Sequence, residues 1–229
     1  MFFTLTSSYY TGRYVMKSDW RVYGKKADFK RLADKYSIDQ VIARIIRNRD
    51  ICGDSDIDMY LNGDIKDMHA PKDMKDAVVS VDIIEKKIKE KCRIRIIGDY
   101  DIDGICSIYI LYKGLLAAGA DVDYVVPHRI NDGYGINEHL IDNALSDGID
   151  TIITCDNGIS AYSQVKYAKD NGMTVIVTDH HDVPFDMIDG EKKYCIPPAD
   201  AVVNPKQTSC KYPFKLLCGA GVAYKLICL

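Results

Sequence analysis

The stretch Ile94-Arg-Ile-Ile-Gly-Asp-Tyr-Asp-Ile-Asp-Gly104 decides the fold of this chain. An apolar run long enough for one buried strand stops at Gly98, aspartates follow at three alternate positions, and Gly104 opens an apolar, helix-like stretch. Carboxylates this close together repel one another, and burying one without a partner is costly. A divalent cation resolves that conflict, because hard cations take carboxylate oxygens as ligands. The turn therefore predicts a metal site.

Three other interpretations of this turn are possible. An EF-hand calcium loop also opens Asp-x-Asp-x-Asp-Gly, but Ile110 stands where that loop needs a bidentate Glu, and a strand rather than a helix precedes it. A strand followed by Asp-x-Asp-Gly also resembles the haloacid-dehalogenase phosphotransferases, whose first Asp is a nucleophile. The turn alone leaves that alternative open. A solvated acidic turn is disfavoured by the apolar strand before it.

Size and composition limit the class of protein. With 229 residues, 47% of them hydrophobic, the chain can bury a core in one large or two small domains. A net charge of −3 gives no global basic surface, so a nucleic acid would need a local patch or a metal. Eight cysteines form no C-x-x-C pair, which indicates reduced thiols and a cytoplasmic protein. We expect no membrane segment, because no apolar run approaches ~20 residues.

The segment before the turn predicts a small helical region. Ser37 is expected to cap a helix whose apolar stripe is Ile38, Val41, Ile42, Ile45 and Ile46. A shorter helix is predicted over 54–61, and a longer one from Asp73. We expect residues 1–19 to be poorly ordered, with Met16 as an alternative start, and residues 20–72 to form the helical N-terminal region.

From residue 93 onward, predicted strands alternate with predicted helices. The strands are expected at 93–98, 122–126, 151–155, 174–178 and 201–203, and the helices between them at 104–118, from Asn137, and at 160–171. This alternation is typical of an α/β fold, with a parallel sheet flanked by helices. We assign residues 73–229 to this domain.

Three of these strands end in an acid, at Asp99, Asp156 and Asp179. Ligands of open parallel sheets bind beyond the carboxyl ends of the strands, so residues distant in sequence meet at one edge. Asp179 is followed by His180 and His181, and we expect one histidine to bind metal while the other faces substrate. A ligand set of Asp and His without thiolate suits Mn²⁺ or Mg²⁺ better than structural Zn²⁺.

At these motifs the chain resembles the DHH phosphoesterase superfamily, and in detail its RecJ branch. The matching segments are Gly98–Gly104, Thr154-Cys-Asp-Asn-Gly-Ile-Ser160, Val177-Thr-Asp-His-His181, Pro127–Gly135, Val203-Asn-Pro205, Tyr212–Ala223 and the helix Val41–Arg49. The similarity runs from about Trp20 to Leu229. The dehalogenase alternative does not explain the histidine pair or the later segments.

The resemblance implies a site for two ions, Mn²⁺ or Mg²⁺. Its ligands would be four aspartates and one histidine: Asp99, Asp101, Asp103, Asp156 and His180. By this assignment the first two serve one ion, Asp103 and His180 serve the other, and Asp156 bridges them.

The resemblance also assigns residues to the substrate. Asp179 and His181 would be catalytic, with Asp179 orienting the site and His181 facing the scissile phosphate. Arg129, Asn157 and Asn204 would contact phosphate or nucleic acid.

The function implied is a metal-dependent exonuclease that hydrolyses single-stranded DNA 5′→3′ by two-metal catalysis, with a role in DNA repair and recombination. It would be a monomer with single-stranded DNA as partner, and a single-stranded-DNA-binding protein or a helicase as further candidates. One alternative is a DHH phosphodiesterase acting on short oligonucleotides or cyclic dinucleotides. Another is a non-catalytic DNA-binding scaffold, which would not need so many like charges.

The sequence departs from the family pattern in two places. Ile97 stands where many superfamily members carry a metal-site His, and a further metal-binding Asp of the family would lie beyond Leu229. We therefore expect an N-terminal piece of a longer protein, nearly inactive alone and active when extended. The last helix is expected to leave Val222, Leu226, Ile227 and Leu229 uncovered, which favours aggregation.

Overall fold

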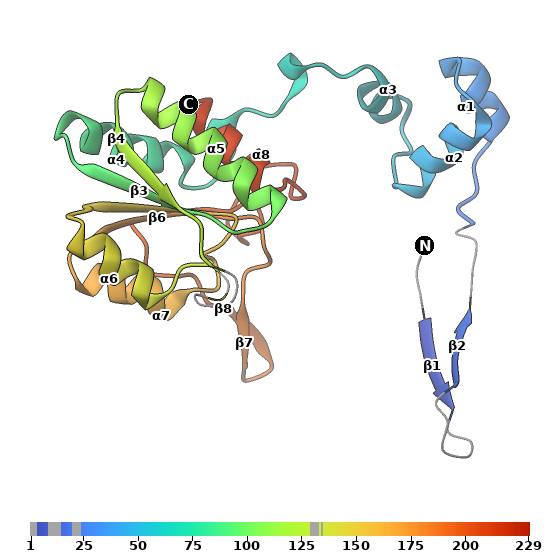
Figure 1. The fold of residues 1–229 in the computed structure, drawn as a ribbon. Helices are drawn as coiled ribbons and strands as arrows, with labels where there is room; N and C mark the ends of the chain where they lie inside the picture. The colour runs from blue at the N-terminus through green and yellow to red at the C-terminus, as the bar shows by residue number, and fades with distance from the viewer. Residues whose placement is uncertain (1–3, 9–14, 20–23, 129–132, 134) are drawn as a thin grey trace. The chain divides into compact units, whose positions relative to one another are not determined.

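The chain divides into two compact units, Met1–Met68 and His69–Leu229, in the computed structural model (Figure 1). The structure describes residues 4–8, 15–19, 24–128, 133 and 135–229. Among the helices of these residues, none combines the length and apolar composition that crossing a bilayer requires. The domain boundaries expected after residues 19 and 72 stay predictions.

The first unit contains a hairpin and a small group of helices. Its elements are β1 (Thr4–Ser8), β2 (Val15–Asp19), α1 (Phe29–Tyr36), α2 (Gln40–Asn48), α3 (Asp54–Asn62) and the 3₁₀ turn η1 (Ile65–Asp67). β1 and β2 pair antiparallel. One buried cluster joins the three helices through Leu32, Ala43, Ile46 and Ile57.

The predicted cap of α2 is wrong, and the predicted apolar stripe is confirmed only at Ile38 and Ile46. Ser37 ends α1 in the left-handed conformation, with φ 53°, and its amide donates to the carbonyl of Ala33. Asp39 begins α2 instead, because its carboxylate accepts a 2.7 Å hydrogen bond from the amide of Val41. The helix then buries Ala43 and Ile46, whereas Val41, with Ile42 and Ile45, is exposed.

The second unit contains a five-stranded sheet and most of the helices. Its elements are η2 (Pro71–Asp73), α4 (Ala77–Lys89), β3 (Arg93–Ile97), α5 (Ile102–Ala117), β4 (Asp121–Val125), α6 (Glu138–Ser146), β5 (Thr151–Cys155), α7 (Tyr162–Asp170), β6 (Thr174–Thr178), β7 (Phe185–Ile188), β8 (Glu191–Tyr194), β9 (Ala201–Val203) and α8 (Gly219–Ile227). The strand order in the sheet is β4-β3-β5-β6-β9, and every neighbouring pair is parallel.

Helices cover both faces of this sheet, as the sequence predicted. One core packs α6 and α7 against Ile152 and Val175, and the other packs α4, α5 and α8 against Ile94 and Ile153. Figure 1 shows α6 and α7 on one side of the strands and α4, α5 and α8 on the other. Alternate strand residues face opposite sides, so both cores draw on the same strands.

The last helix is packed rather than uncovered, which corrects the expectation above. Val222 and Leu226 of α8 are buried, Ile227 is half-buried, and only Leu229 of the four residues is exposed. Gly114 of α5 makes this packing possible, because a Cβ there would lie 2.5 Å from Ile227. Apolar exposure at α8 is therefore no reason for this chain to aggregate.

The hairpin of β7 and β8 was not predicted from the sequence. All eight strand residues are exposed, so they show no alternation of buried and exposed positions. The turn between them is Asp189-Gly190, and both residues have positive φ, 54° and 82°. An Asp-Gly pair between two short runs was the available signal for a tight hairpin.

Candidate metal centre

The carboxyl ends of β3, β5 and β6 bring the predicted acids to one edge of the sheet. Ile97 of β3 lies beside Thr154 of β5, and Cys155 of β5 lies beside Thr178 of β6, so the strands end almost in line. Asp99, Asp156 and Asp179 follow these strands, and all three are buried. The convergence expected from the strand alternation is therefore present.

Two groups of candidate metal ligands share one carboxylate. Asp99, Asp101 and Asp156 offer oxygen atoms that all lie within 4.8 Å of one another. Asp156, His180 and His181 offer a second such set of atoms. Asp156 therefore stands in both groups, whereas Asp103 stands in neither and His181 joins the second. The bridging of two ions by Asp156, which the resemblance implies, stays a prediction. The assignment of individual ligands to individual ions stays a prediction.

The electrostatics around Asp156 fit a hard cation. Burial, and then the neighbouring charges of Asp103 and Asp101, raise the pKa of Asp156 to about 7. The ring of His180 lies close, with Nε2 3.1 Å from Oδ1 of Asp156. Oxygen and imidazole donors without a thiolate suit Mn²⁺ or Mg²⁺. The buried thiol of Cys155 stays protonated, because burial and the nearby carboxylates raise its pKa well above the usual range.

The backbone at Asp156 is held in an unusual conformation. Asp156 has φ 60°, the left-handed region that Asp tolerates better than most residues, and Gly158 follows with φ 110°. A Cβ on Gly158 would also lie 2.5 Å from the hydroxyl of Thr154. The Asp156-Asn157-Gly158 turn therefore aims the carboxylate at the sheet edge at some cost in backbone strain.

Asp103 has a second role that the sequence analysis missed. Its two oxygens accept hydrogen bonds from the first amides of α8, at 2.6 Å from Gly219 and 2.8 Å from Ala220. The same carboxylate lies 3.6 Å from Nε2 of His180. Asp103 thus joins the start of α8 to the candidate centre, and the helix N-terminus favours its negative charge.

Asp179 holds His181 in place. Oδ1 of Asp179 accepts hydrogen bonds from the amides of His180 and His181 and lies 2.7 Å from Nδ1 of His181, while Oδ2 accepts from the amide of Ile159. Burial alone would raise the pKa of Asp179, but the hydrogen bonds from His181 and Ile159 lower it. The same contact raises the pKa of His181.

The two asparagines predicted to bind phosphate are tied to the backbone. The amide group of Asn157 donates to the carbonyls of Ile97 and Cys155, and its oxygen accepts from the amide of Ile136. Asn204 donates to the carbonyl of His181. Both are buried, so they support the walls of the site. Their contact with phosphate stays a prediction.

A pocket of about 430 Å³ adjoins His181 and Asp179. Its other lining residues come from the loop before α6, the turn after β5 and the start of α7: Gly135, Ile136, Asn157, Gly158, Ser160, Ala161 and Gln164. Ser160 and Gln164 were not among the predicted site residues, although Ser160 ends one of the motifs. Arg129, predicted to contact phosphate, lies outside the described residues.

The residues of the candidate centre lie in a part of the chain that matches a known protein family. A family profile described as "DHH family, N-terminal domain" matches residues 93–228. The single-stranded-DNA-specific exonuclease RecJ of Bacillus subtilis is 35% identical over 211 residues, which are 92% of this chain and 26% of the relative. The chain thus spans about a quarter of that relative's length.

Two crystal structures are similar in sequence and in fold. An exonuclease RecJ bound to manganese is 35% identical, with a TM-score of 0.56, and the match covers 67% of this chain and 37% of the other. RecJ from Thermus thermophilus in complex with Mn²⁺ is 31% identical, with a TM-score of 0.52, over 67% of this chain and 20% of the other.

Proposed function

Because the chain belongs to the DHH family, whose N-terminal domain it matches over residues 93–228, we propose that it carries the metal centre of a nuclease. The substrate would be single-stranded DNA and the reaction hydrolysis of its phosphodiester bonds. Similarity to RecJ proteins named as single-stranded-DNA-specific exonucleases supports this substrate, and Mn²⁺ in their crystal structures supports the metal.

One observation carries the proposal, the sharing of Asp156 between two groups of ligands. Without a metal, the ionised carboxylate of Asp156 lowers the stability of the fold, because it is buried and faces the charges of Asp101 and Asp103. The raised pKa of Asp156 reflects this cost. Asp99, Asp101, Asp103, Asp156 and His180 are the residues that would hold Mn²⁺ or Mg²⁺. When bound, such ions make a nucleophile from water and stabilise charge on phosphate oxygens.

The other residues would position the strand and handle a proton. Asp179 fixes the ring of His181 through Nδ1, so Nε2 is the nitrogen that can act on a substrate oxygen. The raised pKa of His181 keeps more of the ring protonated near neutral pH, which suits a proton donor to a leaving oxygen. The pocket beside His181 has the volume of a small-molecule site, which would suit the end of a strand.

The finer assignments belong to the same proposal. We propose 5′→3′ polarity, two ions, a role in DNA repair and recombination, and a cytoplasmic monomer with a single-stranded-DNA-binding protein or a helicase as further partners. Arg129 would contact a substrate phosphate. Asn157 and Asn204 would assist substrate binding by holding the backbone around the site in place.

The test has a binding part and a catalytic part. Calorimetric titration of the 229-residue chain with Mn²⁺ should show binding that Asp156→Asn weakens at least tenfold. A chain extended to the length of its curated relatives should release nucleotides from long single-stranded DNA with Mn²⁺, and Asp156→Asn should abolish this. Absence of Mn²⁺ binding by the native chain would refute the proposal. Faster hydrolysis of dinucleotides or cyclic dinucleotides would favour the phosphodiesterase alternative.

A further inference from the structure

The β7–β8 hairpin carries two faces of different chemistry. The register pairs Phe185 with Tyr194 and Met187 with Lys192, and side chains alternate between faces along each strand. One face therefore consists of these four residues. We call it the aromatic face. The opposite face takes the alternate positions Asp186, Ile188, Glu191 and Lys193.

The aromatic face has no acidic residue and no cover in the described part of the chain. All four of its side chains are exposed, with Met187 at 60%, Phe185 at 42% and Tyr194 at 41%. The rings of Phe185 and Tyr194 meet edge to face with centroids 5.8 Å apart. The ammonium of Lys192 lies 4.1 Å from the centre of the Phe185 ring. Exposed apolar groups gathered around a cation indicate a binding surface rather than a core.

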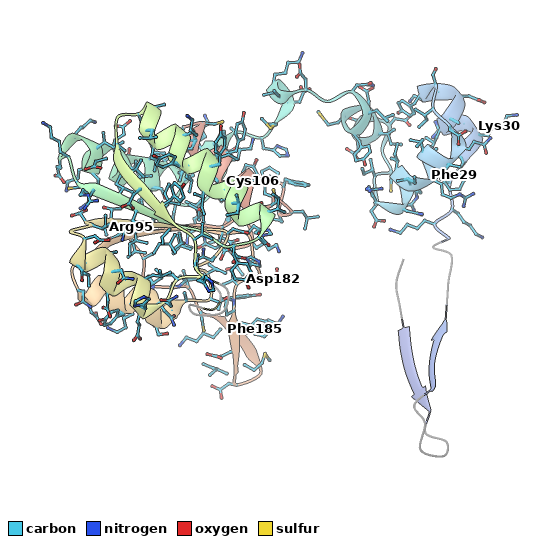
Figure 2. All side chains as sticks on the ribbon, viewed as in Figure 1. Phe29, Lys30, Arg95, Cys106, Asp182 and Phe185 are labelled. Carbon is cyan, nitrogen blue, oxygen red and sulfur yellow. The ribbon has the colours of Figure 1, made fainter. Side chains whose placement is uncertain are left out.

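The hairpin begins immediately after the histidine pair. Phe185 follows His181 by four residues, so their Cα atoms lie at most about 14 Å apart. Val183 is buried in the sheet core, and the amide of Cys195 donates to the carbonyl of Pro184 at 2.8 Å, which closes the base of the hairpin. Figure 2 labels Asp182 at the edge of the sheet and Phe185 on the hairpin that projects from it. The aromatic face is thus tied to the candidate centre by a short, anchored connection.

We propose that the aromatic face binds the bases of the single strand whose phosphate is at the metal centre. Phe185 and Tyr194 would stack on bases, and Lys192 would lie near the adjoining phosphate. Stacking on aromatic rings beside a cation is the usual way in which proteins hold single strands without reading their sequence. The inference deepens the proposed function and rests on it.

The chemistry favours a nucleic acid over a protein partner. Of the four charged residues in the two strands, only Lys192 lies on the aromatic face, so this face presents only positive charge, which complements phosphate. An apolar protein surface would need no lysine over the ring. The acidic residues Asp186 and Glu191 belong to the opposite face, where they do not oppose a polyanion.

The test measures binding of labelled oligonucleotides to the 229-residue chain by fluorescence anisotropy. Ca²⁺ replaces Mn²⁺ so that hard-cation sites are filled while hydrolysis is suppressed. The probes are oligothymidylate and an abasic oligomer of equal length, which has the phosphates without the bases. The double variant Phe185→Ala/Tyr194→Ala is compared with Ile188→Ala, an exposed apolar residue on the opposite face.

The double variant should bind oligothymidylate about tenfold more weakly and the abasic oligomer unchanged. Ile188→Ala should match the native chain with both probes, and Mn²⁺ affinity should be the same in all three proteins. Equal oligothymidylate binding by the native chain and the double variant would overturn the inference, as would no binding by the native chain. A face that serves a protein partner gives the first of these results. If the native chain takes up Mn²⁺ and binds oligothymidylate, but the double variant binds it equally well, only the inference about the aromatic face fails. The proposed nuclease function is not contradicted by that result.

Discussion

The carboxylate of Asp103 accepts a 2.6 Å hydrogen bond from the amide of Gly219, a residue 116 positions later in the chain. The contact joins the first acidic turn to the N-terminus of α8, and the amide of Ala220 adds a second hydrogen bond to the same group. Asp103 therefore acts on the fold as well as on the charge of the candidate centre.

Asp103→Asn should be less stable than Asp101→Asn when no metal is present. Both changes remove one negative charge facing Asp156, but Asn at 101 can still accept from the amide of Gly104 as a helix cap. Asn at 103 offers one acceptor to two amides. We expect a difference of about 1–2 kcal/mol in the free energy of unfolding. Urea unfolding in EDTA measures it, and equal stability would contradict the capping role.

The metal-free chain should lose stability as pH rises from about 4 to about 7. The folded-state pKa of Asp156 is raised from 3.8 to about 7, so the native state holds a proton there that the unfolded state has released. This contribution is complete below the unfolded pKa and is lost as pH passes the folded one. Its size is on the order of 4 kcal/mol at most, at 1.36 kcal/mol for each pKa unit.

Asp156→Asn is the matched control for this pH dependence. The stability difference between native and variant chains, measured by thermal unfolding in EDTA, should follow the titration of Asp156 and of the groups coupled to it. Groups that do not interact with Asp156 cancel, whereas His181 contributes in addition, because the charge of Asp156 helps to raise its pKa. Saturating Mn²⁺ should remove the slope, because a cation favours the ionised carboxylate. A native-minus-variant difference that does not change with pH would show that Asp156 titrates normally.

Asp179→Asn should lower the pKa of His181. The hydrogen bond to Asp179 is the largest cause of the raised pKa, and Asn keeps the shape while removing the charge. Titration of the imidazole proton resonances by NMR, in EDTA, measures the change. His180→Ala serves as control, since it leaves the contact between Asp179 and His181 intact. An unshifted His181 in Asp179→Asn would show that this pair does not set its protonation.

The fold of the second unit was predictable because its strands are apolar runs that end in Gly or Asp. The strands predicted at 151–155, 174–178 and 201–203 are confirmed by β5, β6 and β9, and the start of α6 after Asn137 is confirmed as well. Position at a strand end, together with the parallel order, was enough to bring Asp99, Asp156 and Asp179 together.

Other features depended on tertiary contacts that periodicity does not contain. The apolar stripe expected on α2 included Ile42 and Ile45, which are exposed. The face that packs against the other helices carries Ala43 and Ile46 instead. Apolar residues of α8 were expected to be exposed, but Ile227 packs onto Gly114 of α5, a small residue more than 100 positions earlier in the chain. The acceptors of Asn157 and the amides bound by Asp103 likewise come from distant segments, so only the folded chain shows them.

Asn157→Ala should act mainly by lowering the free energy of unfolding. Its side chain satisfies two buried carbonyls and one buried amide, from Ile97, Cys155 and Ile136. Leaving these groups unpaired should cost about 3 kcal/mol or more in urea unfolding. Asn143→Ala, at an exposed position of α6, should change stability by less than about 0.5 kcal/mol. If both variants unfold alike, the backbone contacts of Asn157 do not support the site.

Gly219→Ala should disturb both the fold and metal binding, and Gly221→Ala should not. A Cβ on Gly219 would overlap the Asp156 carboxylate, so α8 or the Asp156 turn must move, at a cost of about 1–3 kcal/mol. Movement of α8 displaces the amide that Asp103 binds, and movement of the turn displaces the Asp156 carboxylate, so Mn²⁺ affinity should fall at least tenfold in either case. At Gly221 the nearest atom to an added Cβ is the flexible side chain of Leu217 at 3.3 Å, and Ala favours the helix by up to about 1 kcal/mol. Calorimetric titration with Mn²⁺ and urea unfolding of the two variants measure these effects. Unchanged Mn²⁺ affinity in Gly219→Ala would show that the start of α8 does not support the candidate centre.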